Sequence, residues 1–329
     1  MHKLPVLNST AKKATSYLIK AGILLLAFVF IYRRLNNNHD LQQFETLIGN
    51  INRTWAISIM TIVFVLMLVN WVLEAAKWKY LAQRLTHLSL WKSIEAVFCG
   101  LTWAIFTPNR IGEYGGRVMF LPPRRRIHGV FAMAVGSFGQ NVITNVLGAA
   151  ALLWFIASFL HVNILVYAGL GILSVIFMVA MLLFYFNIRW MVSLLNSVKF
   201  LKKFHRFFDI MGRYQFTELL HIMGYCVARF AVFSFQYYLV IHLLIPAIPV
   251  YDVFLMVFIL FFIQSALPSL DLLDIGVRNF TAGTLFAYVT DQKIAVMAAV
   301  TSIWLINLII PAILGSVFVF KLRFFDNNL

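Results

Sequence analysis

Long apolar runs separated by short polar segments dominate the chain. A helix needs about 20 apolar residues to cross the hydrocarbon core of a bilayer, so runs near that length predict membrane-spanning helices. The first run is slightly short, and Arg33 and Arg34 follow it where a signal peptide would have a cleavage site of small residues. We therefore interpret it as an uncleaved first span. The predicted spans are residues 21–32, 55–73, 130–159, 164–186, 218–244 and 294–320.

Two further apolar runs, residues 91–106 and 252–267, are too short to span. At about 1.5 Å per residue each would form a helix of about 24 Å, against a core of about 30 Å. Each run ends at a break with proline and glycine, and a second short helix follows. Irregular backbone at membrane depth is tolerated only inside protein or beside a water-filled cavity, so we expect two re-entrant hairpins. The breaks are residues 107–112 and 268–276, and the helices after them are residues 113–121 and 277–289.

Composition indicates an all-α, polytopic membrane protein. The chain is 62% hydrophobic and 12% charged, with no long polar stretch for a soluble catalytic domain. Its formal net charge of +15 fits basic cytoplasmic loops or contact with anionic lipid. Because the basic residues flank apolar spans, nucleic acid is not an expected partner. The positive-inside rule places residues 77–126, residues 189–213 and both termini inside, and the turns at 160–163 and 246–251 outside.

This assignment of loops to the two sides of the membrane is consistent only if the two hairpins enter the membrane from opposite faces. The chain then contains an internal repeat. Each unit consists of a span, a hairpin and a second span, in opposite orientations. Inverted repeats whose broken helices meet near the midplane are typical of transporters. We therefore predict one transmembrane domain over residues 1–329. It divides into an N-terminal span and loop (1–54), repeat one (55–160), a connecting span and basic loop (161–215) and inverted repeat two (216–329).

Charged residues at the two breaks and in the fifth span form the candidate substrate-binding site. A helix begins after each break, so free backbone N–H groups and the positive end of the helix dipole favour an anion there. Arginine adds forked donors that suit a phosphate, and the carboxylates supply negative charge that suits a zwitterionic or aminoacylated headgroup. The alternative is that Glu113 and Arg117, four residues apart, form a structural salt bridge. The candidates are Arg110, Glu113, Arg117, Arg229, Asp271, Asp274 and Arg278.

Arg229 lies near the middle of the fifth span, where an unpaired cation costs at least about 2.5 kcal/mol on insertion scales. It shares one helix face with His221, Tyr225 and Gln236. We expect Arg229 to face the interior of the protein and to meet a carboxylate or a phosphate.

Other polar residues have two interpretations each. Glu74 and Lys77 follow the second span and are three residues apart, so they can pair on one helix face, but we expect them to anchor the helix at the membrane surface. In the third span, polar residues four apart share a helix face and either join helices or line a polar cavity. These pairs are Gln140 with Thr144, and Asn141 with Asn145.

Enzyme chemistry finds little support in the sequence. There is no glycine-rich P-loop, no His-Glu-x-x-His motif, no nucleophile elbow and no cluster of Cys and His with metal-ligand spacing. Cys99 and Cys226 lie in apolar runs, which favours buried free thiols over a disulfide or a metal site. We expect no catalytic residues, no metal and no cofactor.

Several runs carry a more specific pattern. The first set is Glu74-Ala75-Ala76-Lys77-Trp78 and Thr107-Pro108-Asn109-Arg110-Ile111-Gly112-Glu113-Tyr114 with Arg117, and the second set is Leu267-Pro268-Ser269 and Ile275-Gly276-Val277-Arg278. Together they resemble the flippase-like membrane domain of lysylphosphatidylglycerol synthases, over essentially the whole chain. The second set departs from the family pattern, with Asp271 and Asp274 at glycine-type positions and Asn279 in place of a glutamate. The soluble aminoacyl-transferase domain is absent.

The resemblance implies translocation of a lipid and not its aminoacylation. We expect a multi-pass protein of the bacterial inner membrane that binds and flips a phospholipid or a polyprenyl-phosphate lipid. The alternative is an accessory or scaffold protein for a lipid- or glycan-modifying enzyme, without transport of its own. A membrane-embedded transferase or phosphatase is a third hypothesis. A partner enzyme or a homo-oligomer is compatible with the sequence.

Overall fold

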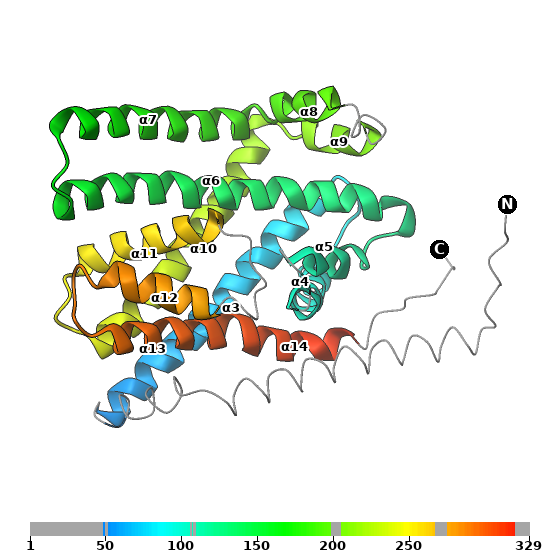
Figure 1. Cartoon of the computed structure of the whole chain (residues 1–329). Helices are drawn as coiled ribbons and strands as arrows, with labels where there is room; N and C mark the ends of the chain where they lie inside the picture. The colour runs from blue at the N-terminus through cyan, green and yellow to red at the C-terminus, as the bar shows by residue number, and fades with distance from the viewer. Residues whose placement is uncertain are drawn as a thin grey trace, which may run out of the picture.

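The computed structural model describes residue 49 and residues 52–105, 107, 110–198, 205–266 and 275–319, and every regular element in these ranges is a helix (Figure 1). In chain order the helices are α3 (Arg53–Ala82), α4 (Leu90–Ala104), α5 (Ile111–Val118), α6 (Arg126–Phe159), α7 (Ile164–Phe186), α8 (Ile188–Ser197), α9 (His205–Gly212), α10 (Phe216–Leu244), α11 (Val250–Ala266), α12 (Ile275–Phe286), α13 (Lys293–Trp304) and α14 (Ile310–Val319). A 3-10 turn, Pro123–Arg125, precedes α6, and a π-helical turn, Leu305–Ile309, joins α13 to α14.

Five helices in the described ranges are long and apolar enough to cross a membrane: α3, α6, α7, α10 and the continuous unit of α13 and α14. The all-α fold and five of the predicted spans are therefore confirmed, and the chain is a multi-pass membrane protein. The predicted first span, residues 21–32, lies outside the described residues.

Helices α3 and α10 pack against each other in antiparallel directions through the polar face predicted for α10. The ring of Tyr80 stacks on His221 with 5.8 Å between centroids, and near the other end Gln236 Nε2 donates to the carbonyl of Val63 at 2.9 Å. Arg229 lies between these contacts and also meets α3. The shared face predicted for these α10 residues is confirmed.

Helices α4 and α5 form an antiparallel hairpin in which two glycines allow the backbones to pack closely. A Cβ added at Gly116 would lie 2.6 Å from the Cα of Gly100, so the two backbones touch where these glycines cross. Between the helices, Arg110 has a left-handed backbone with φ of 57°. The Thr107 hydroxyl accepts from the N–H of Gly112 at 2.7 Å and so ties the break to the start of α5.

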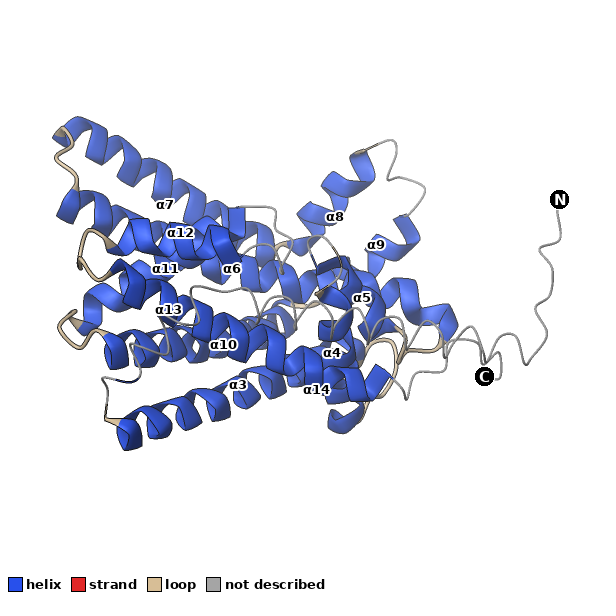
Figure 2. Cartoon of the chain, turned by 60° about the horizontal axis from the view of Figure 1, so that its bottom comes forward, coloured by secondary structure: helices blue, strands red, loops and turns tan. Residues whose placement is uncertain are grey.

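The two short-helix pairs lie along opposite halves of α6. Helix α5 packs against its first half, where Tyr114 Oη donates to Ser137 Oγ at 3.0 Å. Helix α11 packs against its second half, where the rings of Trp154 and Tyr251 meet edge to face at 5.6 Å. Figures 1 and 2 show the same separation, with α4 and α5 at one end of the bundle and α11 and α12 towards the other. The carboxyl end of α11 also lies near the middle of α6, where Ser265 Oγ donates to Asn145 Oδ1 at 3.4 Å.

The last span is interrupted at Asn307 and Pro311. The π-helical turn includes Asn307, and Pro311 has no N–H to donate to the carbonyl one turn earlier, so a regular α-helix cannot continue there. Beyond this turn, α14 packs closely on α4. Thr102 Oγ1 donates to the carbonyl of Ala312 at 2.9 Å, and a Cβ added at Gly315 would lie 2.1 Å from the carbonyl oxygen of Phe98.

Two expectations from the sequence are wrong. The basic segment 189–213 is not simply a loop, because it contains α8 and α9, and these two helices pack together with Ile188 and Val192 of α8 buried. Helix α3 does not end at residue 73 in a surface belt but continues to Ala82. The reason is that its last turns pack inside the protein, where Leu81 accepts from the hydroxyl of Tyr214 at 2.8 Å. Burial raises the pKa of the Tyr214 phenol, which keeps it a donor.

Close packing of the α4–α5 hairpin predicts that Gly116→Ala destabilises the protein. The added methyl meets backbone, and overpacking of this kind costs about 1–3 kcal/mol, more than the gain of up to about 1 kcal/mol from replacing a helical glycine. We expect a lower melting temperature for the purified protein in detergent. Gly169→Ala on α7 is the matched control, because no described atom lies within 4 Å of that Cβ. Equal melting temperatures for the two variants would contradict the close crossing.

Candidate functional site

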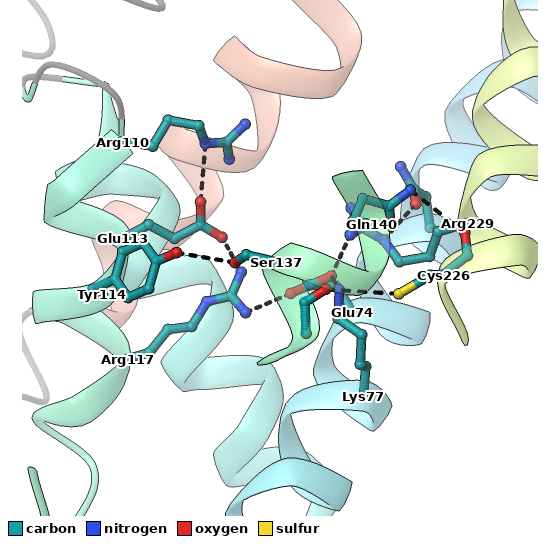
Figure 3. A network of polar contacts seen from close by, with 12 residues as sticks. Glu74, Lys77, Arg110, Glu113, Tyr114, Arg117, Ser137, Gln140, Cys226 and Arg229 are labelled. Carbon is teal, nitrogen blue, oxygen red and sulfur yellow. Dashed lines mark hydrogen bonds and ion pairs between the residues drawn. The ribbon is translucent and has the colours of Figure 1, made fainter. Parts of the chain in front are cut away.

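A buried carboxylate, Glu74 of α3, is the hub of a polar network that joins three helices (Figure 3). Its Oε1 accepts from Arg117 of α5 at 2.5 Å, and its Oε2 accepts from Lys77 of α3 at 2.7 Å and from Arg229 of α10. Glu74 is 5% exposed and Lys77 is 3% exposed. They form the predicted pair but do not anchor α3 at the membrane surface, because each finds its partners inside the protein.

A second carboxylate, Glu113, extends the network towards the first break. Its Oε2 accepts from Arg110 Nε at 2.9 Å, and its Oε1 accepts from Arg117. Arg117 therefore bridges the two carboxylates. The salt bridge that the sequence allowed between Glu113 and Arg117 is present, and Glu113 also faces a cavity.

Helical spacing explains how distant parts of the chain meet here. Lys77 lies three residues after Glu74, and Arg117 lies four residues after Glu113, so each carboxylate has one partner on its own helix. Arg117 and Arg229 join α5 and α10 to α3 through Glu74, and Arg229 adds a hydrogen bond from Nε to Asn70 Oδ1 at 2.9 Å. Breaking one partner from such a buried set costs about 3–5 kcal/mol, because the remaining charges stay desolvated.

A cavity of about 390 Å³ lies beside this network, between the two pairs of short helices. Basic side chains from several helices line this cavity. One of them, Arg278 of α12, donates from Nη1 to Gln264 Oε1 of α11 at 2.9 Å. The charged lining residues are Glu74, Lys77, Arg110, Glu113, Arg229 and Arg278, and the neutral polar ones are Asn70, Ser137, Gln140, Asn141, Thr144, Gln264, Ser265 and Asn307. Aromatic residues, among them Trp71, Phe230, Phe233 and Phe261, complete the wall.

The structure brings together most of the predicted site residues. Arg110, Glu113, Arg229 and Arg278 line the cavity. Arg117 lies just behind the wall as the buried bridge between the carboxylates. Arg229 meets a carboxylate, as expected. Asp271 and Asp274, which complete the predicted set, lie outside the described residues.

Glu74 and Lys77 are the site residues that the sequence analysis assigned to the wrong place. A signal for them was present, because Asn70, Glu74 and Lys77 follow one another at helical spacing on a single face of α3. That pattern extends the polar face into the span, whereas a surface anchor is expected at its end.

The polar residues of α6 fill both roles left open by the sequence. Gln140, Asn141 and Thr144 line the cavity, and Gln140 Nε2 also donates to the carbonyl of Cys226 at 3.5 Å. Asn145 joins helices by accepting from Ser265 at 3.4 Å. These residues lie at the middle of α6, where the two short-helix pairs approach each other.

The amino end of α5 contributes less than expected, because the hydroxyl of Thr107 already accepts from the N–H of Gly112. Side chains therefore supply most of the positive character at the first break. Two well-buried side chains of the wall, Trp71 and Asn307, also keep a polar atom with no hydrogen-bond partner among the described residues. These atoms are the indole N–H of Trp71 and Oδ1 of Asn307, one donor and one acceptor at the edge of the cavity.

Metal chemistry has no obvious site in the described part of the chain, where no group of three or more His, Cys, Asp or Glu side chains is arranged to hold an ion. Cys99 and Cys226 are buried, as the sequence indicated, and neither forms a disulfide in the described part of the chain.

Comparison with known proteins identifies no relative. No family model matches the chain, no curated protein sequence matches it, and no solved structure matches it.

The hub role of Glu74 predicts that Glu74→Gln strongly destabilises the protein. The change removes the negative charge that pairs with Lys77, Arg117 and Arg229. We expect the free energy of unfolding to fall by about 3–5 kcal/mol. Titration with SDS in mixed micelles measures this change. Glu218→Gln is the matched control. Its ion pair with Arg84 is partly exposed, with 30% of the Arg84 side chain and 26% of the Glu218 side chain accessible to solvent. Such a pair contributes about 0–1 kcal/mol to stability.

A double variant tests whether Glu74 and Arg229 stabilise each other. Removing one cation together with Glu74, in the double variant Glu74→Gln with Arg229→Gln, should cost less than the sum of the two single changes. Additive costs would show that Glu74 and Arg229 do not stabilise each other.

Proposed function

We propose that the chain binds the phosphate-bearing headgroup of a lipid in this cavity and translocates the lipid across the bacterial inner membrane. The observation that carries the proposal is the position of the basic groups. Lys77, Arg110, Arg229 and Arg278 reach one cavity inside a bundle of membrane-spanning helices. Charges at membrane depth are costly and mark substrate paths or functional sites by default.

The chemistry of the lining suits a phosphate. The guanidinium of arginine offers two parallel donors that match phosphate oxygens, and a site shielded from water strengthens each charge-assisted hydrogen bond. A wall with aromatic residues beside the charged network also gives the cavity an apolar part. A headgroup attached to an apolar chain fits both parts.

The packing of the helices supports the inverted-repeat interpretation. Unit one contains α3, the pair α4–α5 and α6, and unit two contains α10, the pair α11–α12 and the unit of α13 and α14. The final helix of each unit packs against the first short helix of the other, α6 on α11 and α14 on α4. Helices α3 and α10, the first of each unit, pack antiparallel on each other. Such reciprocal packing is what two inverted copies would produce.

The proposed transport follows from that layout. In inverted-repeat transporters the broken helices meet near the midplane, and one repeat rocks against the other to expose the site to each side in turn. Arg110 belongs to the first break and Arg278 to the helix after the second, so a headgroup held between them would contact both units.

The resemblance to the flippase-like domain of lysylphosphatidylglycerol synthases agrees with this proposal at the level of residues. The first set of motif residues supplies Glu74, Lys77, Arg110, Glu113 and Arg117, which are the members of the network other than Arg229 and Asn70. A scaffold protein without transport would have no use for an interior of this kind, and absence of transport together with a bound enzyme is the outcome that would favour it.

Translocation predicts that reconstituted protein moves a fluorescent anionic phospholipid between leaflets. In liposomes that contain the purified chain, we expect a membrane-impermeant reductant to quench the inner-leaflet probe as it emerges. Arg278→Gln should abolish most of this movement, because it removes a cation from the cavity while keeping a polar side chain. Arg125→Gln removes an exposed cation outside the cavity and should transport normally.

Melting temperatures of both variants show whether the chain is folded. Movement no faster than in empty liposomes, over a panel of anionic phospholipids and polyprenyl phosphates, would contradict the proposed function.

Re-entrant hairpins entering from opposite faces predict a specific labelling pattern. Single cysteines at His87 and Arg125, which flank α4 and α5, should react with an impermeant maleimide from one side. Cysteines at Ala247 and Asp291, which flank α11 and α12, should react from the other side. The background would carry Cys99→Ala and Cys226→Ala. Labelling of His87 and Arg125 positions from opposite sides would show that the first pair of helices crosses the membrane.

A further inference from the structure

We infer that the cavity selects an anionic lipid headgroup that carries a phosphate and hydroxyl groups and lacks an ammonium group. The inference rests on the proposed function, since it takes the cavity as the headgroup site, and it specifies the class of lipid. It departs from the zwitterionic or aminoacylated headgroup that the presence of both charge signs suggested in the sequence.

The first argument is that the carboxylates are already occupied. Each of the four carboxylate oxygens of Glu74 and Glu113 accepts from at least one cationic side chain: Arg117 and Lys77 with Arg229 at Glu74, and Arg117 and Arg110 at Glu113. An ammonium group of a ligand would have to displace one of these protein cations. The displaced cation would then remain desolvated in the protein, which is costly.

The second argument is that the cations keep donors for an anion. Arg229 donates from Nε to Asn70 and from Nη1 to Glu74, so its Nη2 contacts neither of these two partners. Its guanidinium lies over the ring of Trp71, with Cζ 5.4 Å from the centroid, and this cation–π contact also orients it. Lys77 has three N–H donors and a single carboxylate oxygen at 2.7 Å. An entering phosphate can therefore bind without breaking the network.

The third argument is the charge balance. Five basic side chains at the site, Lys77, Arg110, Arg117, Arg229 and Arg278, face the two carboxylates. Asp271 and Asp274 of the second break lie outside the described residues. Even if both belonged to the site, the basic groups would outnumber the acidic ones by five to four. The surplus attracts an anion and repels an aminoacylated headgroup with a net positive charge.

The fourth argument concerns the neutral polar residues that line the cavity. They supply the amides and hydroxyls of Gln140, Asn141 and Thr144 on α6 and of Gln264 and Ser265 on α11. Such groups both donate and accept, which is what a ligand hydroxyl requires. Asn307 Oδ1 and the Trp71 indole N–H, which have no partner among the described residues, add one acceptor and one donor. The wall fits glycerol, inositol or a sugar better than a bare phosphate.

The volume supports a headgroup-sized ligand. Ligand cavities commonly measure about 300–1,000 Å³, and this one is near the lower end at about 390 Å³. A phosphate with a small polyol fits, whereas the acyl or prenyl chains would remain in the bilayer.

The test is a binding measurement on the full chain in neutral detergent, with dioctanoyl lipids as probes. Apparent affinity is read from the rise in melting temperature as each lipid is added. We expect dioctanoyl phosphatidylglycerol to bind at least about tenfold more tightly than dioctanoyl lysylphosphatidylglycerol or phosphatidylethanolamine. Phosphatidic acid, which lacks the hydroxyls, should lie between them. Equal or tighter binding of lysylphosphatidylglycerol would overturn the inference.

A variant with a gain of binding guards against a general loss of folding. Arg110→Gln removes a partner from Glu113 Oε2 at the more exposed end of the network. It should therefore improve binding of lysylphosphatidylglycerol relative to phosphatidylglycerol by about tenfold, a change that misfolding would not produce. Arg125→Gln should keep the wild-type preference, and Thr144→Val should reduce the difference between phosphatidylglycerol and phosphatidic acid. Unchanged preference in Arg110→Gln would count against occupied carboxylates as its cause.

Failure of this inference and failure of the proposed function give different results. Tight, selective binding of phosphatidylglycerol without translocation overturns the proposed function and supports the inference. Translocation with a preference for aminoacylated lipid supports the proposed function and overturns the inference. No saturable binding of any probe overturns both.

Discussion

The structure depends on one buried carboxylate, that of Glu74. A charge in the apolar interior of a membrane protein is stable only when it is paired, and Glu74 is paired with cations from α3, α5 and α10. These contacts fix the register of α10 on α3 and hold the short helix α5 against the long ones. Because Arg117 is shared with Glu113, the same contacts also fix the first break. The position of the hairpin and the shape of the cavity follow from this pairing.

The cavity itself follows from the short helices. A chain of full-length spans would fill the centre of the bundle with side chains, whereas α5 and α11 each cover one half of α6 and leave its middle to polar residues. Glycine at the crossing of α4 and α5 lets the two backbones come into contact. The π-helical turn at Asn307 places another polar residue at the same cavity. These departures from regular apolar helices therefore serve the same region.

The sequence predicted the five spans that the structure describes and most of the candidate site, because apolar length and isolated charges are local signals. It assigned Glu74 and Lys77 to the surface, because a polar stretch with tryptophan and lysine after an apolar run is typical of a membrane interface. Their true partners, Arg117 and Arg229, lie 43 and 155 residues from Glu74 in the chain. No local pattern contains such a contact. The same limit applies to α8 and α9, since a basic segment gives no sign of the helix pair into which it folds.

The pairing within the network bears on transport as well as on stability. A site made of unpaired arginines would bind a phosphate too tightly to release it, and a translocation pathway requires binding that is favourable but reversible. Here Lys77, Arg110 and Arg229 each already have a carboxylate partner, so an anionic headgroup would gain less from each cation than it would from an unpaired one. The surplus of positive charge attracts the headgroup, and the internal carboxylates limit the gain. Under the proposed function, Glu74 and Glu113 would set the affinity of the site without touching the lipid, which accounts for carboxylates in a cavity proposed to bind an anion.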